Sequence, residues 1–73
     1  MGAIETAIDT VKQMIIDGKL RPGQKLPAEK DLADQLGVAR NTLREAVRAL
    51  IAMRVLQTRQ GDGTYVTSLS PGL

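Results

Sequence analysis

Cysteine and histidine are both absent from the 73-residue sequence. Without cysteine the chain has no disulfide, no zinc–thiolate site and no thiol nucleophile. Without histidine it lacks the usual general base and the commonest metal ligand. Phe and Trp are also missing, and Tyr65 is the only aromatic residue, which argues against single-stranded nucleic-acid binding because that mode stacks bases on several rings. We therefore expect no enzymatic activity, no metal and no cofactor.

The length leaves room for one small domain or for a fragment of a longer chain. A chain of this size buries only about 60% of its unfolded surface, so we expect a thin core and three or four short elements. No apolar run approaches the ~20 residues of a membrane span, and the N-terminus has no signal-peptide core. These features predict a soluble, cytoplasmic protein with no membrane partner.

Charge is distributed unevenly along the chain, whose net charge is +2. Residues 1–36 carry five basic and six acidic side chains, whereas residues 37–73 carry five arginines and two acidic side chains. Arginine makes bidentate contacts with phosphate and guanine more readily than lysine does. The basic C-terminal half is therefore compatible with nucleic-acid binding, and it is equally typical of a solvated, mildly basic surface.

The N-terminal half predicts two helices. Apolar side chains at helical spacing indicate a first helix over residues 4–17, namely Ile4, Ile8, Val11 and Ile15. A turn at Pro22-Gly23 and a short extended piece at 24–26 follow. A second helical pattern covers residues 28–36, and we expect Gly37 to end it.

The C-terminal half predicts a third helix and a hairpin. The helix spans about residues 39–54, and its apolar face is formed by Leu43, Ala46, Val47 and Leu50. Two β-prone runs, 55–60 and 64–67, flank a tight turn at 61–63, which is typical of a β-hairpin. The expected fold is mainly α with a small β-hairpin: a winged helix-turn-helix of three helices plus a C-terminal wing at 56–67.

The strongest pattern lies in residues 29–50, where two predicted helices meet at a short turn. Ala33 is small enough for the helices to approach closely, and Gly37 supplies the backbone freedom of the turn. This is the helix-turn-helix pattern, in which the second helix places its N-terminal end in the major groove of DNA. The candidate DNA-binding residues at that end are Arg40, Asn41, Thr42 and Arg44.

The residue types at this end suit DNA. Arginine binds guanine O6 and N7 with two hydrogen bonds, and asparagine does the same for adenine, while a threonine hydroxyl and a helix N-terminus suit phosphate. The competing interpretation is a salt-bridged helix surface. Glu45 lies three residues before Arg48, and we expect this pair to be structural. The positions four residues before Arg40 and Arg44 hold Leu36 and Arg40, so neither has a carboxylate there, which favours DNA contact.

The predicted hairpin adds a second candidate surface. Arg59, Gln60 and Gly61 lead into a tip that nothing in this chain is expected to cover. A hairpin after a helix-turn-helix is a wing, which lies along the DNA backbone or reaches into the minor groove. The alternative for Arg59 is that its stem only packs on the outer face of the hairpin.

Three stretches of the chain resemble the N-terminal winged-helix domain of the GntR family of bacterial transcription regulators. They are LPAEKDLA at 26–33, GVARNTLREAV at 37–47 and GDGTYV at 61–66. The Arg44–Val47 stretch is most similar to the FadR-type branch of that family. The resemblance implies DNA-binding residues at Lys30, Arg40, Asn41, Thr42, Arg44, Gln60 and Gly61.

The chain departs from the family pattern at three positions. The family usually has serine at the position of Ala28, often has glycine at the position of Arg54, and commonly has threonine at the position of Asn41. A serine at position 28 would cap the second helix. Because Asn41 differs, the family's operator sequence does not carry over to this chain.

The resemblance also implies how the chain is organised. Residues 1–67 form the DNA-binding domain, and residues 68–73 are a tail or the start of a linker to an absent C-terminal domain, which would bind a small-molecule effector and hold a dimer together. We expect an isolated domain to be monomeric and a full-length regulator, such as a repressor, to be a homodimer on a palindromic double-stranded operator. The alternative function is a winged-helix module for protein–protein contact without specific DNA readout.

Overall fold

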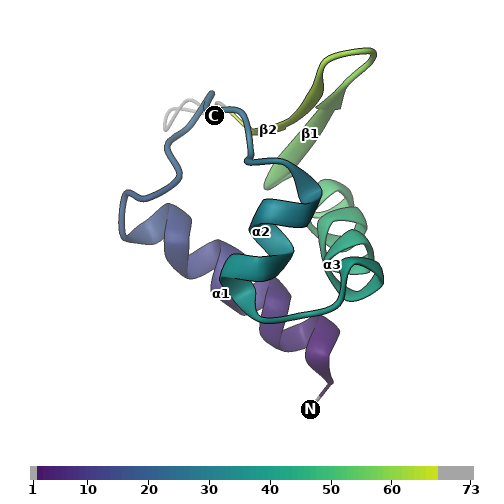
Figure 1. Cartoon of the computed structure of the whole chain (residues 1–73). Coiled ribbons are helices and arrows are strands. Elements are labelled where there is room, and N and C mark those ends of the chain that lie inside the picture. The colour runs from purple at the N-terminus through teal and green to yellow at the C-terminus, as the bar shows by residue number, and fades with distance from the viewer. Residues whose placement is uncertain (1, 68–73) are drawn as a thin grey trace.

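The structure, a computed structural model, describes residues 2–67. This part of the chain contains three helices and one β-hairpin. In chain order the elements are α1 (Ala3–Ile16), α2 (Glu29–Leu36), α3 (Arg40–Ala52), β1 (Leu56–Arg59) and β2 (Gly63–Val66). The helices pack against one another, and the hairpin projects beyond the C-terminal end of α3 (Figure 1). The predicted fold class is confirmed, and the element boundaries differ from the predicted ones by one or two residues.

The helices enclose a single apolar cluster. Helix α1 packs mainly on α3, and it buries Ala7 and Val11 completely while Ile8 and Ile15 lie at the edge of the core. Ile4, at the start of the predicted apolar face, is 39% exposed. The buried members of the cluster are Val11, Leu20, Leu26, Leu32, Ala33, Leu43, Leu50, Leu56 and Val66. Every element therefore contributes to one core, which fixes the wing relative to α3.

The turn between α2 and α3 has the predicted geometry. Gly37 adopts a left-handed conformation (φ 70°), in which a residue with a Cβ is strained. The Val38 N–H donates to the Ala33 carbonyl at 3.1 Å, which ends α2 and turns the chain toward α3. Ala33 is fully buried at this junction. These contacts hold the start of α3 at the surface of the domain.

Helix α3 ends two residues earlier than the predicted boundary at 54. Arg54 is the one non-glycine residue with positive φ (63°) among the described residues. The Val55 N–H donates to the Leu50 carbonyl at 2.9 Å and closes the helix end. Arg54 thus occupies a backbone conformation that glycine adopts with less strain.

The wing contains an additional extended segment that the sequence did not predict as a strand. Strands β1 and β2 pair antiparallel, with Leu56 opposite Val66 and Arg59 opposite Gly63. On the other side of β2, the backbone around Lys25 pairs with Tyr65. The Leu26 N–H donates to the Thr64 carbonyl, and the Val66 N–H donates to the Gln24 carbonyl, both at 2.8 Å. The loop before α2 is therefore tied to the wing.

The predicted tail at 68–73 lies outside the described residues. No helix within residues 2–67 is long and apolar enough to cross a membrane.

Candidate nucleic-acid interface

The N-terminal end of α3 presents polar side chains above a buried apolar face. Arg40, Asn41 and Arg44 are exposed, and Thr42 is half-buried. Leu43, between Thr42 and Arg44, is fully buried. Ala39 precedes the helix and provides no side-chain cap, so the first backbone N–H groups of α3 have no side-chain acceptor at that position. The helix therefore offers arginine, amide and backbone donors at one end, as predicted.

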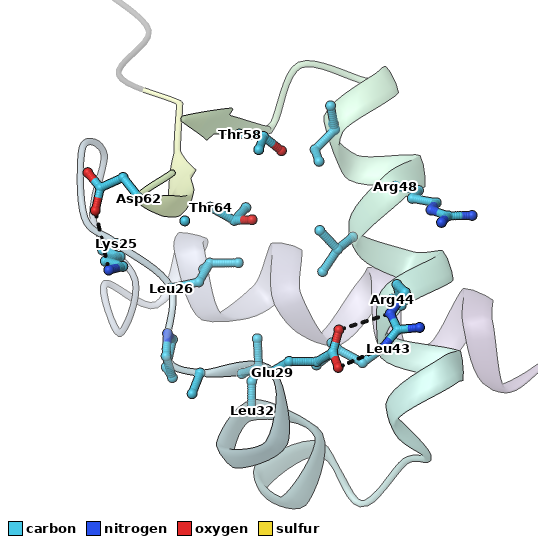
Figure 2. Close-up of a pocket in the computed structure, with 15 residues that line it drawn as sticks. Lys25, Leu26, Glu29, Leu32, Leu43, Arg44, Arg48, Thr58, Asp62 and Thr64 are labelled. Atoms are coloured by element: carbon cyan, nitrogen blue, oxygen red, sulfur yellow. Dashed lines mark hydrogen bonds and ion pairs between the residues drawn. The ribbon is translucent and has the colours of Figure 1, made fainter. Parts of the chain in front are cut away.

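Both arginines are bound to the same carboxylate, which comes from the start of α2. Arg44 donates through Nε to Glu29 Oε2 at 3.1 Å and through Nη2 to Glu29 Oε1 at 3.0 Å. Arg40 donates through Nε to Glu29 Oε1 at 3.2 Å. Figure 2 shows Glu29 reaching from α2 to Arg44 on α3. The hydrogen bond from Arg44 lowers the pKa of Glu29 below its ordinary value, with further lowering by Arg40.

Helical spacing does not predict this ion-pair network, because such spacing relates carboxylates and arginines on the same helix only. Glu29 lies 11 residues before Arg40 and 15 before Arg44. The helix-turn-helix brings the first turn of α2 beside the first turns of α3, so the proximity follows from the fold and not from helical spacing. The separate Glu45–Arg48 pair is present as predicted, at 3.2 Å.

Lys30 follows Glu29 in the first turn of α2, and its side chain is exposed. A cation at this position is available to a DNA phosphate. Lys30 directly follows Glu29, the residue whose carboxylate binds both arginines.

The turn of the wing is held by a cluster of side chains around Asp62. The Tyr65 hydroxyl donates to Asp62 Oδ2 at 2.6 Å, and Lys25 Nζ lies 3.4 Å from Asp62 Oδ1. The hydrogen bond from Tyr65 lowers the pKa of Asp62. A Cβ at Gly63 would lie 2.8 Å from Lys25 Cε, so glycine permits this close approach. Lys25 lies 37 residues from Asp62 in sequence, so no local pattern predicts this contact.

Arg59 stacks on the aromatic ring of the wing. Its guanidinium carbon lies 4.1 Å from the centre of the Tyr65 ring, a cation–π distance. The contact supports the interpretation that the Arg59 stem packs on the hairpin. The Arg59 side chain is exposed, so its guanidinium N–H donors remain accessible to a phosphate. Gln60 and Gly61 are exposed at the tip.

A groove of about 580 Å³ separates the start of α2, helix α3 and the wing. Its floor is apolar, with Leu26, Leu32 and Leu43 among the lining residues, and Arg44 and Arg48 lie on its α3 side (Figure 2). Of the eight predicted DNA-binding residues, Arg44 alone lines the groove. The other α3 residues lie at the exposed helix start, and the wing residues lie at the tip. Within residues 2–67, no group of three or more acidic side chains is placed to hold a metal ion.

A helix-turn-helix followed by an antiparallel hairpin defines this chain as a winged helix-turn-helix domain. Residues 3–66 match the family described as bacterial regulatory proteins, gntR family. The chain belongs to this family.

Relatives and solved structures support the assignment. The chain is 43% identical over 58 residues to the mannosyl-D-glycerate transport/metabolism system repressor MngR of Escherichia coli (strain K12), covering 80% of this chain and 24% of MngR. A Streptococcus agalactiae GntR structure matches with a TM-score of 0.81 and 43% identity, over 89% of this chain and 32% of that one. The structure of the AraR DNA-binding domain in complex with operator ORX1 matches with a TM-score of 0.82 and 34% identity, over 92% of this chain and 81% of that one.

The chain spans about a quarter of the length of the curated relatives it matches. The likeness therefore concerns one domain of those proteins.

Proposed function

We propose that this chain is the DNA-binding domain of a bacterial transcriptional regulator and binds double-stranded DNA sequence-specifically. The observation that carries the proposal is the likeness to the AraR domain in complex with its operator, which extends over 92% of this chain at 34% identity. Helix α3 enters the major groove, and the wing lies on the DNA backbone or in the minor groove.

Each candidate residue has a role suited to its chemistry. Arg40 and Arg44 read guanine, and Asn41 reads adenine. Thr42 and Lys30 contact phosphates. The wing contributes a phosphate contact from Arg59 and close backbone approach at the tip, through Gln60 and Gly61. All of these residues are exposed on α2, α3 and the wing except Thr42, which is half-buried, and this exposure supports the assignment.

The remaining features of the proposal concern the longer protein. Residues 1–67 are the DNA-binding domain and residues 68–73 are a tail or the start of a linker to an effector-binding domain, since the matched stretch makes up only about a quarter of the curated relatives. The isolated domain is a monomer, and the full-length regulator is a cytoplasmic homodimer on a palindromic operator.

The regulator belongs to the FadR-type branch of the family, which is supported by the Arg-Glu-Ala-Val stretch at 44–47. Repression is supported by the likeness to MngR. The sequence has neither histidine nor cysteine, and the proposal includes no enzymatic activity and no cofactor.

Selection from a random pool of duplexes tests the proposal. The 73-residue chain is expected to enrich one half-site sequence, and the selected duplex should outcompete a scrambled duplex of the same composition. Binding to both should weaken as salt rises, because phosphate contacts release counterions. Absence of any enriched sequence would contradict specific readout and favour a protein-interaction module. Sedimentation without DNA should show a monomer, and a tight dimer at micromolar concentration would contradict the proposed state of the domain.

A further inference from the structure

We infer that Glu29 is a specificity-determining residue, which holds Arg40 and Arg44 in the orientation that reads bases and keeps them from binding phosphates at random. The inference rests on the proposed function, because it assigns a role within the same interface. Glu29 itself is a positioning residue: it acts through the two arginines.

The geometry leaves the outer edge of each guanidinium open. A guanidinium carries five N–H donors. Glu29 takes two from Arg44, through Nε and Nη2, so that three remain, on Nη1 and Nη2. These are the donors at the end of the side chain, and they can make the two hydrogen bonds to guanine O6 and N7. Arg40 also keeps its outer edge open, although it contacts only one oxygen: its Nε donates to Glu29 Oε1 at 3.2 Å, and its Nη2 lies 3.2 Å from the same oxygen.

The carboxylate also determines how the two arginines coexist. Arg40 and Arg44 lie four residues apart on one helix, a spacing at which like charges repel. Glu29 Oε1 accepts from both side chains and offsets this repulsion. An exposed arginine has many rotamers of similar free energy, and two hydrogen bonds to one carboxylate select a few of them. The arginine side chains therefore lose much of their rotamer entropy when the domain folds, and they lose less of it on binding DNA.

Burial distinguishes Glu29 from Glu45, the carboxylate of the neighbouring ion pair on α3. The Glu29 side chain is 32% exposed, whereas Glu45, which pairs with Arg48 alone, is 52% exposed. Glu29 lies on a different helix from its partners and lines the groove beside Arg44 (Figure 2). The Glu45–Arg48 pair joins neighbouring turns of one helix. It provides a matched control, because its loss changes the net charge equally without releasing Arg40 or Arg44.

The same carboxylate limits indiscriminate binding. An arginine freed from Glu29 can swing to any nearby phosphate, and a removed negative charge strengthens attraction to every duplex. Glu29→Gln is therefore expected to tighten binding to scrambled DNA and to steepen its salt dependence by about one unit, equivalent to one further phosphate contact. On the selected operator, the orientation lost by the arginines offsets this gain.

The decisive quantity is the ratio of affinities for the selected duplex and its scrambled counterpart, measured by fluorescence anisotropy over a range of salt. For Glu29→Gln we expect this ratio to fall by about tenfold, within the discrimination expected of one bidentate base contact. For Glu45→Gln both affinities should rise together and the ratio should stay that of the parent. Glu29→Asp retains the charge but has a shorter side chain, and its ratio should also fall.

Circular dichroism of each variant separates a folding defect from a loss of orientation. If Glu29→Gln does not fold, the affinity ratio of Glu29→Asp tests the inference: a lower ratio than that of the parent supports it, and an equal ratio contradicts it. A ratio for Glu29→Gln equal to that of the parent or of Glu45→Gln would overturn the inference while leaving specific DNA binding intact. If the parent itself shows no preference for any sequence, the proposed function fails, and the role of Glu29 fails with it.

Discussion

Serine at position 28 is expected to stabilise the domain, because α2 begins without a side-chain cap. Ala28 has non-helical backbone angles (φ −55°, ψ 147°) and makes no side-chain hydrogen bond to the first turn. The residue is exposed, so a hydroxyl fits there without displacing packed atoms. A serine Oγ at this position accepts a hydrogen bond from the backbone N–H of Lys30 or Asp31, which the helix itself leaves without a partner.

The expected gain is about 1 kcal/mol in the free energy of unfolding, the typical contribution of such a cap. For a domain of this size it corresponds to a rise in Tm of about 4–8 °C. Thermal unfolding followed by circular dichroism measures it. Ala52→Ser is the control, because Ala52 is exposed at the last position of α3 and has no capping role. A Tm for Ala28→Ser that stays unchanged or falls, or an equal rise for Ala52→Ser, would refute the reasoning.

Four further predictions follow from single interactions. Arg54→Gly should raise stability in urea by about 1 kcal/mol, because it removes the cost of the left-handed conformation; a loss of stability would contradict this. Arg44→Ala should weaken operator binding by about 1–3 kcal/mol and relax preference at one base; unchanged preference in a repeated selection would exclude its readout role. Arg59→Ala should weaken binding to all sequences and lower the salt slope by about one unit, whereas an unchanged slope would show that Arg59 only packs on Tyr65. The lowered pKa of Glu29 means that its stabilising contribution is present above the ordinary value of 4.5 and is lost as pH falls through the folded-state value; Glu29→Gln should therefore lose less stability in acid titrations than the parent, and parallel curves would contradict the linkage.

Local features of the sequence were sufficient to predict the helices and the hairpin. The apolar spacing in α3 predicted an inward face of Leu43, Ala46, Val47 and Leu50; Val47 is half-buried against the core, and the other three are buried. Gly37 was expected to end α2, and α2 ends there, with Gly37 in a left-handed conformation. These features depend on residues within a few positions of each other, which is the range over which periodicity and turn chemistry act.

Contacts between distant residues could not be predicted in the same way. The pairing of Lys25 with Tyr65 joins a loop to a strand 40 positions later, and no periodicity links the two. The same holds for Glu29, which meets Arg40 and Arg44 because the turn folds α2 back onto α3. The sequence therefore predicted the exposed helix start that carries the candidate residues, whereas the contact of Glu29 with two of them could not be predicted.

The central claim, that α3 and the wing bind one DNA sequence, is tested most directly by an NMR titration of the isotopically labelled 73-residue chain with its selected duplex. The account predicts that amide shifts concentrate at residues 40–44, at Lys30 and at 59–61, and that a scrambled duplex perturbs them less at equal concentration. Residues of α1 such as Asp9, exposed on the N-terminal helix, should change little. Equal shifts with both duplexes, or the largest shifts on α1, would contradict the account.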